Sequence, residues 1–511
     1  MSIVLFNMLW EIGTLGLLNV VTFLEQQGYS TKHVYLTKRY SETETPEELN
    51  AILSFVEKTQ PILIGFSLMT FNFNRTRRIS LELKRHFPHI PILWGGIHPT
   101  FDPEESLKYA DYVCVGEGED AILELVQSIE SGAPTKGIRN IWHQQNGQIH
   151  KNEVRPLIQN LDDYPFPVFN WNSTFCLDKG RIVRLSHNLY RKYVMYSGTM
   201  YDIMASRGCP YSCSYCCNAL FRSIYRNKGK YVRYRSVDNV IRELQYAKRE
   251  FPYINMVNIQ DDGFAAAPEE YLREFSQKYK TNIGLPLRLR IIPTSLTRNK
   301  VKYLSDANTL VAVLGIQSSD RINTEIFNRH VSAETLIDAA RMLKEHNIVG
   351  QYDLIVRNPY ETEEDMIEIC RILSRMPKPY KLEMFPLAFF PNTPLRARAI
   401  RDAIEVNEAD GYETPYGNYP IKYPYLLRLQ TVCPYTPRFL VELFLQKRNS
   451  RFARAMFCLY YYFVYEVIDK ARAGIMRNTM LVALTKKIIF LPNTLICHLK
   501  AICRTKPSSL R

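Results

Sequence analysis

Short runs of β-branched and aromatic residues alternate with helical patterns along most of this chain, in two separate series. The first series fills the first 140 residues, where apolar residues at helical spacing lie between and after the strand-like runs. This alternation is typical of a parallel sheet covered by helices on both faces, so we expect a doubly wound α/β domain. The expected strands are residues 3–7, 33–36, 62–67, 92–94 and 112–115, and the expected helices are residues 15–27, 46–58, 75–87 and 120–131.

Small and polar residues follow several of these strands. Ligands of doubly wound sheets bind at the carboxyl ends of the strands, and glycine there permits close approach of a large flat ligand. Ordinary strand-to-helix turns remain an alternative for each glycine pair taken singly. The candidate ligand contacts at this edge are Ser67, Thr70, Gly95, Gly96, His98, Gly116, Glu117 and Gly118.

The second series consists of six strand–helix units in the middle of the chain. It predicts a partial (β/α)6 barrel of the TIM type, in which chemistry takes place at the carboxyl ends of the strands. The polar residues that stand at those ends are candidates for a binding site, although each could also cap a helix. The expected strands are residues 201–206, 256–259, 287–291, 311–316, 351–355 and 381–387, with helices at residues 237–249, 333–346 and 363–376, and the polar candidates are Gln260, Asp261, Asp262, Arg290, Gln317 and Ser318.

Four of the eleven cysteines fall between residues 209 and 217. Cys209, Cys213 and Cys216 have the spacing Cys-x3-Cys-x2-Cys, which can bind three irons of a [4Fe–4S] cluster and leave the fourth iron open to another ligand. A structural zinc site usually takes four protein ligands, and no matching second pair lies nearby, so zinc is the weaker alternative. Cys217 is predicted to be a packing residue. Cysteine usage of this kind favours metal chemistry over a disulfide framework.

The segment Arg207-Gly208-Cys209-Pro-Tyr-Ser-Cys213-Ser-Tyr-Cys216, followed by the barrel pattern, resembles the radical S-adenosylmethionine (SAM) superfamily over about residues 196–399. The resemblance implies that the open iron binds SAM. In that family a Gly-Ile-Glu-Ser segment follows the fourth strand, and here it reads Gly315-Ile316-Gln317-Ser318. A neutral amide can still hydrogen-bond the ribose of SAM, without adding charge. The SAM contacts implied are Tyr215, Asp261, Asp262, Arg290, Gln317 and Ser318.

The runs WGGIHPTFDPEE and YADYVCVGEGEDA in the first 140 residues resemble the cobalamin-binding domain that precedes the barrel of many radical SAM enzymes. The resemblance implies a flavodoxin-like or Rossmann-like fold in which the Gly95–Gly96 and Gly116–Gly118 loops cradle the corrin. Methionine synthase and the mutases supply a cobalt ligand from an Asp-x-His-x-x-Gly motif, which this sequence lacks. We therefore expect a cobalamin without a lower His ligand, and His98 to be a loop contact.

Four regions follow from these patterns. Residues 1–140 are expected to form the cobalamin-binding domain, 141–195 a linker with a hairpin at Asn146-Gly147, 196–400 the radical SAM domain, and 401–511 a mainly helical, basic region. In the last region, residues 416–437 are rich in Tyr and Pro and are predicted to be irregular. Residues 451–470 and 479–503 are predicted to be helices.

This domain combination resembles the methyltransferases that act on unactivated carbon or phosphorus centres. In that class a 5′-deoxyadenosyl radical removes a hydrogen atom and methylcobalamin gives up its methyl group, so the protein positions the reactants and excludes water. Beyond the cluster and SAM contacts we assign no catalytic residue. Oxidative cyclases and rearrangement enzymes share the architecture and remain an alternative, and a non-catalytic cobalamin and iron–sulfur sensor is an alternative of another class. The implied electron donor is a flavodoxin or ferredoxin.

The net charge of +14 is unevenly distributed. Residues 447–511 contain 13 Lys or Arg against Glu466 and Asp469, so the rest of the chain is nearly neutral. This distribution excludes a chain-wide nucleic-acid footprint, and we expect a small-molecule or lipid-like substrate. Without a secretory signal or a run of ~20 apolar residues, a cytoplasmic location is expected. The C-terminal helices are predicted either to pack with solvated basic faces or to contact the inner membrane surface.

Overall fold

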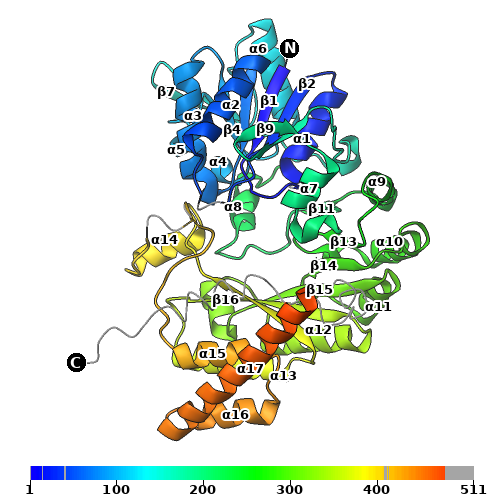
Figure 1. Cartoon of the computed structure of the whole chain (residues 1–511), viewed down its shortest axis with the longest axis vertical. Coiled ribbons are helices and arrows are strands. Elements are labelled where there is room, and N and C mark those ends of the chain that lie inside the picture. Colours follow the sequence, from blue (N-terminus) through cyan, green and yellow to red (C-terminus); the bar gives the residue numbers. More distant parts are fainter. Residues whose placement is uncertain (1, 14, 40–41, 408–410, 413, 478–511) are drawn as a thin grey trace. The chain divides into compact units, whose positions relative to one another are not determined.

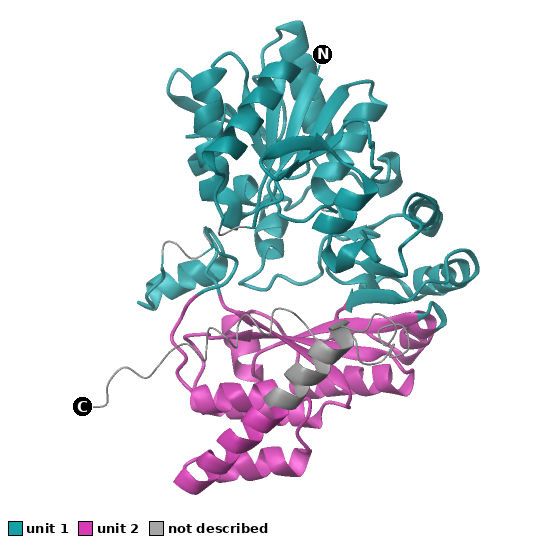
Figure 2. Cartoon of the chain, in the orientation of Figure 1, with its two compact units in different colours: residues 1–290, 306–308, 388–417 teal, residues 291–305, 309–387, 418–511 magenta. Residues whose placement is uncertain are grey.

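The computed structural model describes residues 2–13, 15–39, 42–407, 411–412 and 414–477. The chain forms two compact units (Figure 2), and each is described by itself. Unit 1 comprises residues 1–290, 306–308 and 388–417, and unit 2 comprises residues 291–305, 309–387 and 418–511.

The first sheet has nine strands in the order β7-β6-β5-β4-β3-β1-β2-β8-β9. Strands β1 to β5 are parallel and reproduce the order 2-1-3-4-5 of flavodoxin-like folds, whose ligands bind at the switch point between β1 and β3. All five strands predicted for the first 140 residues are present. Their bounds are β1 (Ser2–Asn7), β2 (Ser30–Tyr35), β3 (Leu63–Ser67), β4 (Ile92–Gly95) and β5 (Tyr112–Cys114).

Both faces of this sheet are covered by helices, as Figure 1 shows. Alternate residues of β1 therefore enter different cores: Val4 and Phe6 pack in one hydrophobic cluster, and Ile3 and Leu5 pack in another. This double burial explains why the strands read as nearly continuous apolar runs. The helices of this domain are α1 (Leu15–Gln26), α2 (Pro46–Thr59), α3 (Phe73–His86), α4 (Ile97–Phe101), α5 (Pro103–Ser106) and α6 (Glu119–Ser131).

The stretch expected to be a linker adds strands to both edges of the same sheet. The hairpin predicted at Asn146-Gly147 joins β6 (Ile141–Gln145) to β7 (Gln148–Lys151), and β6 pairs antiparallel with β5. A second hairpin, β8 (Thr174–Asp178) and β9 (Arg181–Arg184), extends the other edge through β2. A helix, α7 (His187–Tyr193), then leads to the barrel strands.

The six strands predicted for the barrel form a second sheet in the order β10-β13-β14-β15-β16-β17. Its neighbouring strands pair in parallel, both among the first three, in unit 1, and among the last three, in unit 2. The alternating α/β pattern predicted by the sequence is confirmed. The strands are β10 (Met200–Ile203), β13 (Met256–Ile259), β14 (Leu287–Ile291), β15 (Thr309–Gln317), β16 (Val349–Val356) and β17 (Tyr380–Pro386), and the helices between them are α8 (Cys217–Ile224), α9 (Val237–Glu250), α10 (Glu269–Asn282), α11 (Arg298–Asp306), α12 (Ala333–Glu345) and α13 (Glu363–Arg375).

A short antiparallel pair is formed by β11 (Ser206–Arg207), which precedes the cysteine motif, and β12 (Arg233–Tyr234), which follows α8. Serine and threonine caps start several barrel helices. The hydroxyl of Ser236 accepts from Asn239 at the start of α9, and Thr362 and Asp365 form a capping box at the start of α13.

The C-terminal region is helical, with α14 (Pro394–Arg401), α15 (Pro424–Val432), α16 (Arg438–Gln446) and α17 (Arg451–Arg477). The expectation that residues 416–437 are irregular is wrong for the part that forms α15. Pro424 is the first residue of that helix, where the missing amide hydrogen of proline costs nothing. The helix predicted at residues 451–470 is α17, and the one predicted at residues 479–503 lies outside the described residues. No helix within the described part of the chain is both long enough and apolar enough to cross a membrane.

Candidate functional site

The three cysteines of the Cys-x3-Cys-x2-Cys motif share one loop of unit 1, between β11 and α8. The chain enters this cluster loop (residues 208–216) through Gly208, whose φ of +92° is in the left-handed region. A Cβ at this position would lie 2.5 Å from the carbonyl oxygen of Tyr231, so the loop needs glycine here. The loop then turns where the amide of Cys216 donates to the carbonyl of Cys213 at 3.0 Å.

The thiols of the cluster loop differ in environment. Cys213 is buried, whereas Cys209 and Cys216 are half-buried. Burial raises the pKa of the Cys209 thiol to about 12. Hydrogen bonds from the Cys217 thiol and from Asn218 lower the pKa of Cys216 to about 7. Cys217, predicted to be a packing residue, therefore lies against the third cysteine of the motif.

Three thiolates on one short loop fit three irons of a [4Fe–4S] cluster. Among the described residues, no three His, Cys, Asp or Glu side chains are gathered closely enough to bind a single metal ion. In the cluster each thiolate binds a different iron, so the cysteines need not converge on one point.

Asp261, predicted to contact SAM, anchors the backbone just before the cluster loop. Its carboxylate accepts a hydrogen bond from the amide of Ala205 at 2.7 Å and another from the hydroxyl of Ser206 at 2.5 Å. The side chain is fully buried, and this burial raises its pKa to about 7. The structure thus gives Asp261 a positioning role, while its contact with SAM stays a prediction.

Asp262, the second predicted SAM contact at this strand end, faces the cluster loop. Its Oδ2 accepts from the Nδ2 of Asn218 at 3.0 Å, and the same nitrogen lies 3.7 Å from the Sγ of Cys216. The hydroxyl of Tyr231 donates to the Oδ1 of Asn218 at 2.7 Å and fixes that amide. Asn218 and Tyr231 are site residues that the sequence does not single out, because their role depends on contacts across the loop.

A row of polar side chains crosses β10, β13 and β14. Asp202 accepts from Asn258 at 2.6 Å and from Gln260 at 3.2 Å. Arg288 donates to the Oδ1 of Asn258 at 2.8 Å, and Arg290 donates to the Oε1 of Gln260. Only Arg290 and Gln260 are among the sequence predictions. Asp202, Asn258 and Arg288 could have been found from the sequence pattern. Polar residues stand at every second position of otherwise apolar strands, which places them on one face of the sheet.

Glu11, in the loop after β1, is a further buried carboxyl that the sequence does not single out. Burial and the nearby Asp202 raise its pKa to about 8, so it is largely protonated near neutral pH. The amide of Met195 donates to its Oε1 at 3.2 Å. The first domain thus contributes an acidic group beside the polar row of the barrel strands.

The other predicted SAM contacts lie in two places. Tyr215 is half-buried within the cluster loop, and the carbonyl of its neighbour Ser214 accepts from the amide of Leu395 at 3.0 Å. Gln317 and Ser318 belong to unit 2 at the end of β15 and are described only there.

Gln317 has a left-handed backbone, with a φ of +66°, and its side chain folds over Gly315, where a Cβ would collide with it. The hydroxyl of Ser318 is fully buried and donates to the Oε1 of Glu361 at 2.7 Å. Burial raises the pKa of Glu361 to about 7. Glu361 is thus another carboxyl that the sequence does not single out, since it lies 43 residues from Ser318 along the chain.

At the carboxyl edge of the first sheet, the candidate cobalamin loops are connected to one another. Gly96 has a φ of +99°, and a Cβ there would lie 2.8 Å from the carbonyl oxygen of Leu68 and 3.3 Å from the Oγ of Ser67. The hydroxyl of Thr100 donates to the carbonyl of Gly96, and it accepts from the amide of Gly116 at 3.0 Å. Gly96 is therefore needed for close packing between two loops of this edge, while the approach of a large ligand stays a prediction.

His98 is almost fully buried, and its ring contacts the rings of Phe73 and Tyr412. Burial lowers its pKa to about 4, so the imidazole is neutral. Its Nε2 atom has no hydrogen-bond partner in the described structure, and its amide donates to Leu68. Thr70, also buried, lies in the same region, with its methyl group 3.7 Å from the Cβ position of Gly411.

Glu117 joins the first sheet to the strands β11 and β12, while its contact with the corrin stays a prediction. Its carboxylate accepts from Arg233 at 2.5 and 3.2 Å, and an Nη of Arg207 lies 3.4 Å away. Arg207 also donates to Glu119 at 2.6 Å. Although burial opposes charge, these guanidinium groups hold the pKa of Glu117 below its ordinary value.

The backbone of the same loop is fixed by Tyr225. The amide of Glu117 donates to the Tyr225 hydroxyl at 2.7 Å, and a Cβ at Gly116 would lie only 2.0 Å from that oxygen. Gly118 is also crowded, since a Cβ there would meet Ile122 at 3.2 Å. We call Glu117, Glu119, Arg207, Arg233 and Tyr225 the bridge, because these residues connect the Gly116–Gly118 loop to β11, to β12 and to the end of α8.

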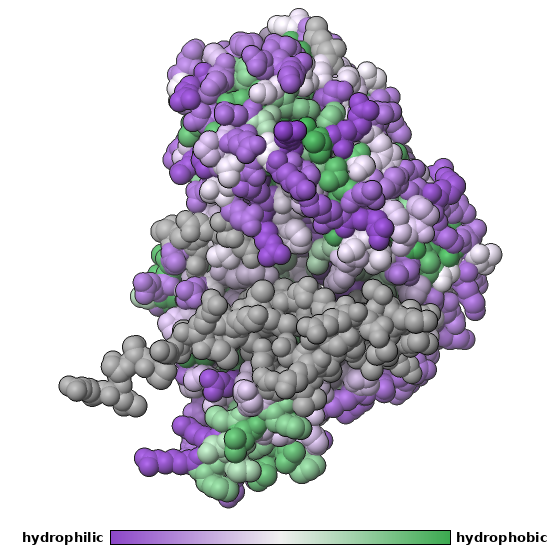
Figure 3. Space-filling model, in the orientation of Figure 1, coloured by the Kyte–Doolittle hydropathy of each residue, from purple (hydrophilic) through white to green (hydrophobic). Residues whose placement is uncertain are grey.

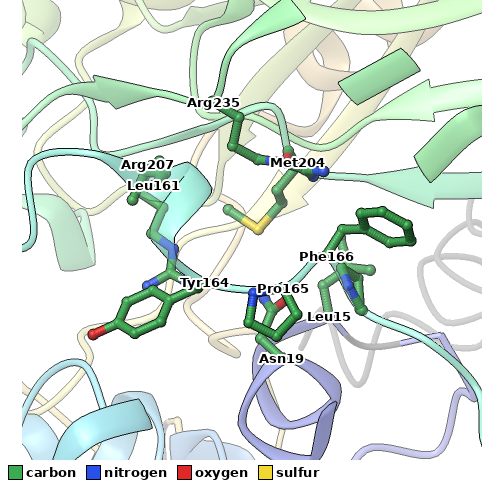
Figure 4. Close-up of a pocket in the computed structure, with 10 residues that line it drawn as sticks. Leu15, Asn19, Leu161, Tyr164, Pro165, Phe166, Met204, Arg207 and Arg235 are labelled. Carbon is green, nitrogen blue, oxygen red and sulfur yellow. The ribbon is translucent and has the colours of Figure 1, made fainter. Parts of the chain in front are cut away.

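A small cavity of about 30 Å³ adjoins the bridge in unit 1 (Figure 4). Tyr164 and Arg207 line it, with the Arg207 guanidinium 5.9 Å from the Tyr164 ring centre. The cavity is also lined by Pro165, Met204 and Arg235. This volume holds about one water molecule and is too small for a cofactor.

Two family models match the chain: the B12 binding domain matches residues 1–126, and the radical SAM superfamily matches residues 203–373. An uncharacterized methyltransferase of Pyrococcus horikoshii is 26% identical over 320 residues, which is 62% of this chain and 64% of that protein. The anaerobic magnesium-protoporphyrin IX monomethyl ester cyclase of Cereibacter sphaeroides is 22% identical over 409 residues, which is 76% of this chain and 60% of that protein. The chain thus spans less than two thirds of the length of either relative.

Among solved structures, the radical SAM methyltransferase TsrM of Kitasatospora setae, with cobalamin and a [4Fe–4S] cluster bound, matches with a TM-score of 0.64 at 18% identity. The match covers 80% of this chain and 79% of that one, and it supports the fold. The matched domains agree with the flavodoxin-like sheet, the parallel barrel strands and the cysteine loop described above. The chain therefore belongs to the radical SAM enzymes that carry an N-terminal cobalamin-binding domain.

Proposed function

We propose that this protein transfers a methyl group from SAM, by way of cobalamin, to an unactivated carbon or phosphorus centre of its substrate. The bridge is the observation that carries the proposal. It connects the edge of the cobalamin-binding sheet directly to β11, which leads into the cluster loop, and to its partner strand β12. A reaction that uses both cofactors in one cycle needs them held at a fixed separation.

When bound, the cluster and SAM supply a 5′-deoxyadenosyl radical, and cobalamin supplies a methyl group. The residues of this chain hold and orient these groups. Cys209, Cys213 and Cys216 would hold the cluster, and Asp262 would orient Asn218 beside the Cys216 thiol. Because hydrogen-atom abstraction needs no general base, the lack of an assigned catalytic acid–base pair is compatible with the proposal.

The polar row of Asp202, Asn258, Gln260, Arg288 and Arg290 offers hydrogen bonds and positive charge to a carboxylate. We propose that Arg290 binds the carboxylate of SAM, as the sequence predicts. The substrate is proposed to be a small or lipid-like molecule. The electron that cleaves SAM is proposed to come from a flavodoxin or ferredoxin.

An oxidative cyclase or rearrangement enzyme is the second candidate. The similarity to the cyclase of Cereibacter sphaeroides extends over 76% of this chain and favours keeping it. The two candidates differ in their products. A methyltransferase releases both S-adenosylhomocysteine and 5′-deoxyadenosine in each cycle, whereas a cyclase of this type releases 5′-deoxyadenosine without S-adenosylhomocysteine.

The test uses reconstituted, reduced enzyme with SAM and extracts fractionated for substrate. We expect S-adenosylhomocysteine, 5′-deoxyadenosine and a product heavier than its precursor by one methylene. Substrate-dependent 5′-deoxyadenosine without S-adenosylhomocysteine would replace the methyltransferase with the cyclase.

Cys213→Ala and Cys217→Ala form a matched pair for the non-catalytic alternative. Both remove a thiol from the same segment, but only Cys213 belongs to the motif. We expect Cys213→Ala to abolish 5′-deoxyadenosine formation and Cys217→Ala to retain it. Undiminished formation in Cys213→Ala would refute the cluster assignment, and no formation by the wild-type holoprotein would support the sensor.

A further inference from the structure

Exposed apolar side chains gather on two C-terminal helices of unit 2. Twelve large hydrophobic side chains are exposed in the described part of the chain, and eight of them lie on or just before α16 and α17. The green area at the foot of Figure 3 shows part of this surface. We call it the apolar face; it consists of Tyr435, Phe439, Leu443, Phe452, Met456, Leu459, Tyr462 and Phe463.

The spacing of these residues puts them on one side of each helix. In α17, Phe452, Met456, Leu459 and Phe463 follow one another at intervals of four, three and four residues, which form a single stripe. Three of them are at least 67% exposed. Such crowding differs from the single exposed hydrophobic residues that any protein has, and it marks an interaction surface.

Another side of α17 packs inward at Phe457 and Tyr460, so the apolar face is not an unfinished core. Phe457 is fully buried, and its ring lies 4.6 Å from that of Tyr425 and 5.1 Å from that of Phe444. The hydroxyl of Tyr460 donates to Thr436 at 3.0 Å. The helix is therefore fixed to unit 2 by one side and presents a second apolar side to the outside.

The charges around the apolar face are almost all positive. Between Tyr435 and Val464 there are five Lys or Arg residues and one acid, Glu442, which lies 3.6 Å from Arg371. Arg438, Lys447, Arg451 and Arg454 are exposed. The positive excess continues along the sequence to Arg511. A partner must therefore be apolar where it meets the aromatic rings and negative around them.

This charge pattern distinguishes between the partners that could bind the apolar face. A second copy of the chain would bring the same cations against these ones, and residues 478–511 of the chain itself are also basic and carry no acid. A bilayer with anionic headgroups offers both an apolar interior and negative charge, and aromatic side chains are favourable at its interface. At about 1.5 Å per residue, α17 could lie along such a surface for about 40 Å.

We propose that the apolar face of α16 and α17 docks on an anionic lipid surface, with the helices lying in the interface. The eight apolar side chains enter the headgroup region and the flanking cations contact lipid phosphates. This proposal does not depend on the reaction proposed above.

The test measures flotation of the full-length protein with vesicles of phosphatidylcholine alone or mixed with phosphatidylglycerol. We expect binding to the mixed vesicles and at least tenfold weaker binding to phosphatidylcholine alone, falling further with added salt. Each cation near an anionic surface contributes roughly fivefold to affinity. Arg438→Gln, Lys447→Gln and Arg451→Gln together should therefore weaken binding by on the order of 100-fold.

The apolar contribution is tested by combining Phe452→Ser, Leu459→Ser and Phe463→Ser. Leu81→Ser with Ile400→Ser is the matched control, because these side chains are 49% and 60% exposed but belong to α3 and α14 of unit 1. We expect the first variant to lose binding and the control to keep it, while both retain the circular dichroism and thermal unfolding of the wild type.

Three results would overturn the proposal. The first is equal flotation of wild type and the apolar variant. The second is a wild-type dimer in solution that the apolar variant converts to a monomer, which would assign the face to a second copy. The third is a loss of binding on deleting residues 478–511 with no effect of the apolar substitutions, which would assign lipid binding to that segment.

Discussion

The carboxylate of Glu117 is the point at which the bridge can be broken with the smallest change of shape. Glu117→Gln keeps the side-chain length and one oxygen acceptor but removes the negative charge that faces Arg233 and Arg207. The backbone contact between the Glu117 amide and Tyr225 should persist. The substitution therefore tests the ion pairs of the bridge, separately from the fold of the loop.

The magnitude follows from the burial of the partners. The Arg233 side chain is only 3% exposed, and without Glu117 its remaining contacts are the carbonyl groups of Ile158 and Tyr231. Removing one member of a buried ion pair costs about 3–5 kcal/mol. Because Glu117 itself is 26% exposed, we expect the lower end of this range, about 3 kcal/mol. This energy corresponds to about a 100-fold lower population of the conformation in which the bridge is intact.

The assay compares two half-reactions that need no substrate. Cleavage of SAM to 5′-deoxyadenosine requires the cluster loop. Methylation of reduced cobalamin by SAM also requires the cobalamin-binding loops to be held in the correct position relative to the cluster loop. We expect Glu117→Gln to lower the second rate by up to about 100-fold and to leave the first within a few-fold. Hydrogen exchange of the apoprotein should be faster in peptides that cover residues 113–120 and 205–210.

Glu153→Gln is the matched control. Glu153 pairs with Lys228 at 2.5 Å, but its side chain is 70% exposed, so its loss should change neither half-reaction nor exchange. An equal decrease in the rates of both half-reactions in Glu117→Gln would show that the bridge has only a general structural role. Unchanged rates and unchanged exchange would refute the reasoning.

Three other substitutions test single features of the structure. Gly208→Ala should prevent assembly of the cluster, because its Cβ would lie 2.5 Å from the Tyr231 carbonyl, and iron and sulfide content after reconstitution measures this; full occupancy would contradict it. Gly96→Ala should weaken hydroxocobalamin binding, measured by absorbance, since its Cβ would lie 2.8 Å from the Leu68 carbonyl, whereas Gly28→Ala, at a positive φ but with open space, is the control. Glu361→Gln should become more stable relative to wild type as pH rises. The pKa of Glu361 is raised to about 7 from an ordinary 4.5, so the folded state favours the protonated carboxyl. The stability that this carboxyl gives the wild type is therefore complete below about pH 4.5 and lost above about pH 7. Urea unfolding at pH 5 and pH 8 should show a gain of up to about 3 kcal/mol for the variant, and a pH-independent difference would exclude the explanation.

Much of the fold could be predicted from the sequence because its signals are local. Strands such as β4 and β13 are short apolar runs bounded by turn residues, and helices such as α9 and α13 begin at a serine or threonine cap. Each signal depends on a few neighbouring residues. The cysteine spacing is local in the same way, so the cluster loop was identifiable without coordinates.

The predictions that differ from the structure concern segments whose conformation depends on contacts far away along the chain. The predicted linker contains β6 to β9, which extend the first sheet because its edges offer unpaired backbone groups far away along the chain. The segment that forms α15 reads as irregular because of its Tyr and Pro content, yet it packs Leu426 and Leu429 into unit 2. No local pattern encodes either outcome.

The sequence by itself determined the two cofactor domains, the cysteine motif and the basic C-terminal region. The tertiary structure decided what the polar residues do. Glu117 reaches Arg233, which lies 116 residues away, and Asp202 meets Asn258 across two parallel strands. A charged group is stabilised by whichever partner the packing brings within hydrogen-bond distance, and that partner is set by the fold. Sequence spacing therefore identified which groups carry the chemistry, and folding determined which of them hold the site together.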